Sequence, residues 1–372
     1  MVEWILHTKD LAVGYGGRPL ISDIEIAVRQ GEILVLIGPN GAGKSTILKT
    51  ISRQLAPVAG TVYLENSALG TLPAAKAAKT MAILMTGRVE PELMTCEDVV
   101  SAGRYPYTGR FGVLTAEDYA QMDAAMELVH VSELRDKDFT RISDGQRQRV
   151  MLARAICQQP KVLVLDEPTS FLDIRYKLEL LQILKELARE KQVAVILSLH
   201  ELDLAQKAAD RIVCVHGDTI DRCGTPEEIF SGGYIQQLYG VPRQQFNESF
   251  GSLELQAPSG APEVFVIGGG GAGIPVYRSL QRRGVPFAAG VLHENDLDLP
   301  VARALAARVV TERAFEPIGE AAFAEAAAVL ADCRRVICCC RSFGTMNERN
   351  AALRELAKRR GVLTEGDGTD GL

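Results

Sequence analysis

The sequence predicts two consecutive α/β domains, and three observations support that prediction. An apolar run, Ile33 to Ile37, leads through a glycine loop into an apolar-periodic segment, which is the order strand, loop, helix. Apolar runs and periodic segments alternate again after residue 262, which is typical of a second, smaller, doubly wound sheet. Between the two regions, residues 257–262 are rich in proline, serine and glycine, as linkers are. The 372 residues also exceed what one ordinary core holds.

Composition indicates a globular protein of the cytoplasm. Hydrophobic residues make up 47% and charged residues 24%, and apolar runs such as Val193 to Leu197 are too short to span a bilayer. The N-terminus has no signal-peptide pattern. A net charge of −6 argues against a nucleic-acid partner. Among eight cysteines, Cys338, Cys339 and Cys340 are consecutive; we expect small buried residues there rather than a metal site.

The glycine loop has the spacing that a polyphosphate requires. Its glycines let successive backbone N–H groups turn inward, and the helix that follows adds its dipole. Lys44 would reach the outer phosphates, and the hydroxyl of Ser45 would be a ligand of Mg²⁺. We therefore expect ATP or GTP to bind here. The loop residues are Gly38, Pro39, Asn40, Gly41, Ala42, Gly43, Lys44, Ser45 and Thr46.

The elements around this loop follow from hydrophobic periodicity. Two strands are expected at residues 3–13 and 20–28, and Tyr15 lies in the glycine-rich hairpin between them. Tyr15 is either a stacking partner for an adenine ring or an ordinary core or turn residue. Two short strands, 61–65 and 81–84, and two helices, 97–103 and 115–130, come next. A helical insertion of this kind suggests a surface for another protein.

Three further segments carry candidate catalytic side chains. Ser143 and Gln146 form a capping box at the start of a helix whose N–H groups would suit a phosphate, although a plain capped helix fits as well. A buried strand then ends in Asp166, which would hold the metal, and Glu167, which would orient or deprotonate the attacking water. Two solvated acids at a strand end are the alternative. His200 ends the next buried strand, where ligands bind in parallel sheets.

In this order and spacing the motifs resemble those of ATP-binding cassette ATPases over about residues 1–242. The resemblance implies a P-loop NTPase cassette, with a mixed sheet core and a helical subdomain at about 87–158. It also implies a homodimer that sandwiches two ATP molecules, in which Tyr15 stacks on adenine and Thr46 helps Lys44 and Ser45 to hold phosphates and Mg²⁺. From the partner subunit would come the helix start with Ser143, Gly145 and Gln146, and Asp173 would bridge the dimer. Glu167 would then be the catalytic base, and His200 would contact the γ-phosphate.

The segments 102–107, 171–175 and 224–229 look like the subfamily that imports iron–siderophore complexes, haem or vitamin B12. That likeness implies two transmembrane permease subunits, an extracytoplasmic substrate-binding protein as an indirect partner, and a peripheral position on the cytoplasmic face of the membrane. Two alternatives stay open: a soluble cassette ATPase, and a sensor in which nucleotide binding without turnover reports ligand occupancy of the C-terminal domain.

Two positions depart from the family pattern. Thr86 stands where a glutamine usually touches Mg²⁺, and its shorter arm makes direct metal contact doubtful. Asp144 replaces the first glycine of the signature helix. Its charge suits the helix dipole but should repel the γ-phosphate bound by the partner subunit, so we expect weaker or slower ATP-driven closure.

We expect the first domain to cover residues 1–245, a linker 246–262, a Rossmann-like domain with a possible regulatory role 263–363, and a disordered tail 364–372. In the second domain, Gly268, Gly270 and Gly273 follow a strand with dinucleotide spacing, and Glu294 and Asp296 follow the next strand. A dinucleotide, another small ligand at the strand ends, and simple packing or dimer contact are all open interpretations.

Overall fold

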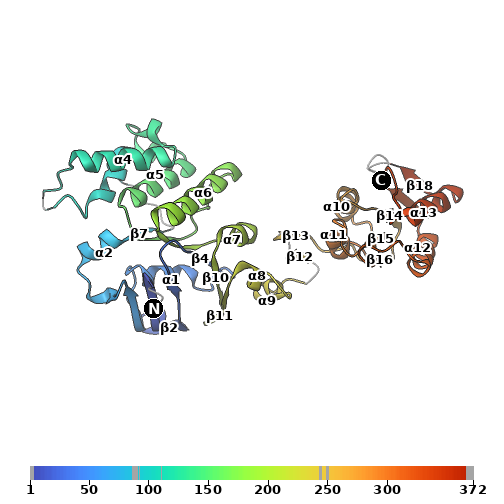
Figure 1. The fold of residues 1–372 in the computed structure, drawn as a ribbon, viewed down its shortest axis with the longest axis horizontal. Helices are drawn as coiled ribbons and strands as arrows, with labels where there is room; N and C mark the ends of the chain where they lie inside the picture. The colour runs from blue at the N-terminus through green and yellow to red at the C-terminus, as the bar shows by residue number, and fades with distance from the viewer. Residues whose placement is uncertain are drawn as a thin grey trace. The chain divides into compact units, whose positions relative to one another are not determined.

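The computed structural model describes residues 4–85, 91, 93–109, 111–242, 245–248 and 251–365. It divides the chain into two compact units, Met1–Tyr239 and Gly240–Leu372 (Figure 1). The division falls just before the segment expected to be the linker. Each unit has hydrophobic clusters of its own and is described separately. Within the described residues, no helix is both long and apolar enough to cross a membrane.

The described residues of the first unit form two sheets. An antiparallel sheet has the order β2-β1-β5-β6, with β3 also on β1: β1 (Leu6–Tyr15), β2 (Arg18–Ile24), β3 (Ala27–Val28), β5 (Ala59–Leu64) and β6 (Ser67–Ala68). The other sheet has the order β11-β10-β4-β9-β8-β7: β4 (Ile33–Ile37), β7 (Met81–Leu84), β8 (Val162–Leu165), β9 (Ala194–Ser198), β10 (Arg211–His216) and β11 (Thr219–Gly224). All its pairs are parallel except β10 with β11, so the expected mixed sheet is confirmed. The single strand expected at 20–28 is two strands, β2 and β3. Between them the regular ladder with β1 is interrupted, because the N–H of Ile26 donates to the hydroxyl of Thr8 at 2.8 Å instead of to a backbone carbonyl.

Helix α1 (Lys44–Ile51) lies in the core between these sheets, where Ile47, Leu48 and Ile51 pack with apolar residues of both. The other helices of the unit are α2 (Ala74–Thr80), α3 (Cys96–Ser101), α4 (Ala116–Leu128), α5 (Asp144–Cys157), α6 (Ile174–Lys191), α7 (Leu202–Ala208), α8 (Pro226–Ile229) and α9 (Tyr234–Tyr239). Single 3-10 turns lie at Leu69–Thr71, Ala102–Arg104, Ser132–Leu134 and Phe139–Arg141. Helices α3, α4 and α5 pack together as the helical subdomain (Figure 1).

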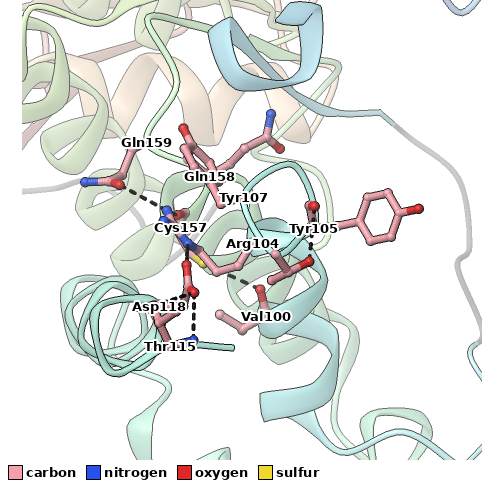
Figure 2. Close-up of polar contacts among 10 residues, drawn as sticks. Val100, Arg104, Tyr105, Tyr107, Thr115, Asp118, Cys157, Gln158 and Gln159 are labelled. Carbon is pink, nitrogen blue, oxygen red and sulfur yellow. Dashed lines mark hydrogen bonds and ion pairs between the residues drawn. The ribbon is translucent and has the colours of Figure 1, made fainter. Parts of the chain in front are cut away.

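A buried ion pair ties this subdomain together (Figure 2). Arg104 Nε donates to Asp118 Oδ1 at 2.8 Å, and its Nη1 donates to the carbonyl oxygen of Cys157 at 2.8 Å. Asp118 also accepts the backbone N–H and hydroxyl of Thr115, and these bonds, together with the one from Arg104, lower its pKa to about 2. Because both charged side chains are buried and hydrogen-bonded, the pair fixes how α4 packs against α5.

The second unit is built on a parallel sheet with the order β16-β15-β14-β17-β18. Its strands are β14 (Val264–Ile267), β15 (Phe287–His293), β16 (Arg308–Glu312), β17 (Arg335–Cys338) and β18 (Leu363–Glu365). Helices α10 (Ile274–Arg282) and α11 (Leu299–Leu305) pack on one face, and α12 (Glu320–Asp332) and α13 (Glu348–Arg359) on the other (Figure 1). This is a doubly wound sheet whose strand order reverses between β14 and β17.

Two expected boundaries of this unit need correction. The expected linker contains a hairpin, β12 (Phe246–Asn247) with β13 (Ser252–Leu253), and buried Phe246 lies in the strand that contacts α11. The expected disordered tail does not include Thr364 and Glu365, because both residues pair with β17. Residues 366–372 lie outside the described residues.

Candidate nucleotide site

The glycine loop joins β4 to α1, as the sequence predicts. Gly38, Gly41 and Gly43 have φ angles of 148°, 80° and 95°, a region that favours glycine. Gly38 is also crowded, since a Cβ there would lie 2.2 Å from the carbonyl oxygen of Val215 in β10. Pro39, Asn40 and Ala42 complete the loop, whose backbone shape therefore depends on glycines at fixed positions.

The loop's cation points inward. Lys44 is 5% exposed, and its Nζ donates to the carbonyl oxygens of Gly38 at 2.7 Å and Pro39 at 3.0 Å. Burial lowers the pKa of Lys44, while the nearby carboxylates of Glu167 and Asp166 act in the opposite direction. An anion bound at the loop would give this buried ammonium a stronger partner than two neutral carbonyls.

Beneath the loop, the ends of β8 and β9 bring four polar side chains together. Ser45 Oγ donates to Asp166 Oδ1 at 3.0 Å, and Ser198 Oγ donates to the same oxygen at 2.8 Å. The backbone N–H of Glu167 donates to Ser198 Oγ at 2.9 Å, and His200 Nε2 lies 2.5 Å from Glu167 Oε1. The structure therefore places Ser45, Asp166, Glu167 and His200 in one chain of contacts.

Ser198 is the member of this cluster that the sequence analysis missed. Its side chain is fully buried at the end of β9 and bridges the two acids. A hydroxyl inside an otherwise apolar strand was the available signal, because buried polar groups need partners.

Tyr239 was also missed, and here no local signal exists. Its hydroxyl accepts the N–H of Gly38 at 3.0 Å from 201 positions away in the sequence. Burial raises the pKa of Tyr239 to about 12, so this hydroxyl stays neutral. The last residue of the first unit thus contacts the first residue of the phosphate loop.

The remaining expected residues lie on three separate elements. Tyr15 is exposed at the end of β1, with its hydroxyl 3.4 Å from Thr46 Oγ1. Ser143 caps α5 and makes the expected capping box with Gln146, beside Gly145. Asp173 caps α6 by accepting the N–H of Tyr176 at 3.0 Å. Thr86 lies outside the described residues, so its expected distance from the metal is untested.

Glu201 connects the site to α6. Its carboxylate accepts Thr169 Oγ1 at 2.9 Å and Lys177 Nζ at 2.5 Å. Glu201 follows His200 directly, and Lys177 is on the first turn of α6, the helix that Asp173 caps. A displacement of His200 would therefore be passed through Glu201 and Lys177 to α6.

In the second unit, the glycine loop is already occupied by carboxylates. Asp298 Oδ2 accepts the N–H groups of Gly269 at 2.5 Å and Gly273 at 2.9 Å, and Asp296 accepts the N–H of Gly270 at 3.0 Å. Asp298 is fully buried, and burial raises its pKa.

The other second-unit candidates give a phosphate no support at this loop. A Cβ on Gly268 would lie 2.3 Å from the hydroxyl of Tyr277, so the glycine is needed for packing. Glu294 is exposed, and Asp296 caps the loop instead of being free for a ribose. A phosphate would have to displace two carboxylates of the chain itself, so the structure argues against the dinucleotide interpretation.

Sequence comparisons agree with this geometry. A family model described as ABC transporter matches residues 21–170, and one described as the MJ0874 family matches residues 287–370. The uncharacterized ABC transporter ATP-binding protein MJ0873 of Methanocaldococcus jannaschii is 42% identical over 289 residues, which are 77% of this chain and 100% of that protein.

Two relatives have names that state a cargo. The iron(3+)-hydroxamate import ATP-binding protein FhuC of Bacillus subtilis is 37% identical over 63% of this chain and 88% of its own length. The cobalamin import ATP-binding protein BtuD of Halobacterium salinarum is 33% identical over 80% of this chain and 76% of its own length.

Solved structures share the fold of the first unit. An ATP-binding subunit of an ABC transporter matches with a TM-score of 0.55 and 27% identity, over 64% of this chain and 95% of that one. The dimeric cassette MJ0796 matches with a TM-score of 0.54 and 23% identity, over 59% of this chain and 98% of that one.

Proposed function

The chain belongs to the ATP-binding cassette family of transporter ATPases, and from this premise we propose that it hydrolyses ATP to power an importer. The observation that supports the proposal best is the chain of contacts from Ser45 through Asp166 and Ser198 to Glu167 and His200. These contacts support a metal-binding role for Ser45 and Asp166 and a base role for Glu167.

ATP and Mg²⁺ are the proposed ligands of the first unit. The Ser45 hydroxyl and the Asp166 carboxylate are oxygen donors 3.0 Å apart, which is the donor chemistry that Mg²⁺ prefers. When bound, the ion would neutralise charge on the phosphates. Lys44 would exchange its two loop carbonyls for phosphate oxygens, Thr46 would support them, and Tyr15, half exposed at the loop's rim, would stack on adenine.

Glu167 is the proposed base for the attacking water. Its backbone N–H donates a hydrogen bond to the hydroxyl of Ser198, and its carboxylate lies 2.5 Å from His200 Nε2. A carboxylate held in this way orients water and accepts its proton without first having to reorganise. For His200 the proposed role is a contact with the γ-phosphate.

A homodimer completes the proposed site. Each α5 N-terminus, with Ser143, Gly145 and Gln146, would face the ATP on the partner subunit, and Asp173 would bridge the two subunits. The dimeric cassette among the structures with this fold supports that arrangement.

The proposed partners are two membrane-spanning permease subunits, through which an extracytoplasmic substrate-binding protein acts. Tyr105, Phe111 and Val113 of the helical subdomain are 76%, 90% and 68% exposed, which suits a protein contact. The named relatives suggest chelated iron, haem or cobalamin as the cargo. The chain would then sit on the cytoplasmic face of the membrane, and we propose no nucleic-acid partner.

For the second unit we propose a regulatory role with a small ligand at the carboxyl ends of its strands. Since Asp296 and Asp298 hold the glycine loop, that ligand would bind beside the loop rather than through phosphate contacts with it.

The deciding measurement is phosphate release by the full chain with ATP and Mg²⁺. Glu167→Gln should lower turnover by about a hundredfold or more, since it removes the base. The matched control is Glu190→Gln, an exposed position on α6, which should keep the wild-type rate. Equal rates for wild type and Glu167→Gln would contradict the proposal and support a nucleotide sensor. Co-purification with a permease tests the transport role.

A further inference from the structure

A negative side chain stands at the start of the signature helix α5. Asp144 is the first helical residue, directly after the Ser143 cap, and its side chain is 51% exposed. In the proposed dimer this end of α5 faces the triphosphate held by the partner subunit. An uncompensated carboxylate there would repel that triphosphate, which is the effect expected from sequence alone.

The structure compensates this charge with Arg147. One turn further along α5, Arg147 Nη1 donates to Asp144 Oδ1 at 3.0 Å. The guanidinium also donates from Nη2 to the carbonyl oxygen of Thr140 at 2.6 Å and from Nε to that of Phe139 at 3.3 Å. Three acceptors therefore hold this cation in one orientation beside Asp144.

We infer that Arg147 is a positioning residue for ATP-driven closure, because it cancels the charge of Asp144 at the end of α5 that faces the partner's nucleotide. The inference rests on the proposed function and adds a charge rule to it. The Asp144–Arg147 pair has a net charge of zero, so the helix end presents its N–H groups and dipole without a net repulsive charge. The extent of ATP-driven closure should depend on the summed charge of Asp144 and Arg147, and not on the charge of either residue alone.

A double-mutant cycle in the full chain tests the rule. Arg147→Ala leaves a net charge of −1 and should raise the KM for ATP about tenfold. Asp144→Asn leaves +1 and should lower the KM severalfold. The double variant restores a net charge of zero, and its KM should return to within about twofold of wild type. ATP-dependent dimerisation in a Glu167→Gln background, followed by light scattering, should rank the variants in the same order.

The matched control is Arg141→Ala. It removes the same charge three residues before Asp144, but its side chain is 84% exposed and pairs loosely with Asp138 at 3.5 Å. It should leave the KM unchanged. Raising the salt concentration should shrink the differences within the cycle, because exposed charges are screened.

Two outcomes overturn the inference. If the double variant keeps the raised KM of Arg147→Ala, so that Asp144→Asn does not restore it, Arg147 acts only by holding the Phe139–Thr140 turn. If Arg147→Ala changes neither KM nor dimerisation, the charge has no role. Both outcomes are distinct from failure of the proposed function, in which the wild-type chain itself would release no phosphate.

Discussion

Ser198 offers the sharpest test of how the catalytic cluster is built. Its hydroxyl makes two bonds inside the protein, accepting the N–H of Glu167 at 2.9 Å and donating to Asp166 Oδ1 at 2.8 Å. Ser198→Ala removes the hydroxyl that makes both bonds, and it adds no bulk to the site. A buried polar group left unpaired costs about 1–3 kcal/mol, so we take about 2 kcal/mol for this site.

The backbone of Glu167 should relax in that variant, because φ at this residue is 49° and the bond to Ser198 helps to hold it. Restoring its position in the transition state would then cost up to about 2 kcal/mol, or about thirtyfold in kcat. The KM for ATP should change little, because Lys44 and the loop glycines are untouched.

Steady-state phosphate release gives both constants for this test. A suitable control is Ser279→Ala, which removes a buried serine in the second unit and should leave kcat unchanged. A kcat for Ser198→Ala within twofold of wild type would refute the reasoning. A matching fall in the fraction of active protein, checked by active-site titration, would show misfolding instead.

Three further predictions follow from single contacts. Tyr239→Phe should raise the KM for ATP about fivefold with kcat unchanged, because one hydrogen bond to Gly38 is lost; an unchanged KM would contradict this. Asp118 has a pKa lowered to about 2 from 3.8, so its contribution to stability is complete above pH about 4 and is lost as pH falls towards 2. Urea unfolding of Asp118→Asn should therefore show a weaker pH dependence in that window than wild type. Asp298→Ala should speed hydrogen exchange at the amides of Gly269 and Gly273, since their acceptor is removed; equal exchange rates would refute that role.

Much of the fold and site could be predicted from sequence because the signals are local. The strand, glycine loop and helix around Lys44 depend on neighbouring residues, and so does the capping box at Ser143. Periodicity likewise located the second sheet. It missed β18, whose three residues are a strand only because β17 lies beside them.

The contacts that sequence could not supply join segments that are far apart along the chain. Tyr239 reaches Gly38 across 201 positions, and no pattern near either residue indicates it. Arg147 is different, because it lies three residues from Asp144, where ion pairs form on helices. Asp144 considered alone predicts repulsion of the triphosphate bound by the partner subunit. In the proposed dimer, the ion pair with Arg147 cancels that repulsion.

The two glycine loops of this chain show why a loop pattern alone does not determine a ligand. Both follow a parallel strand and precede a helix, so both turn N–H groups towards the carboxyl edge of a sheet. In the first, the side chain that reaches in is the ammonium of Lys44, which favours an anion. In the second, Asp298 and Asp296 arrive from the segment after β15 and take the N–H groups themselves. The charge brought by other residues, rather than the glycine spacing, decides which loop can hold a phosphate.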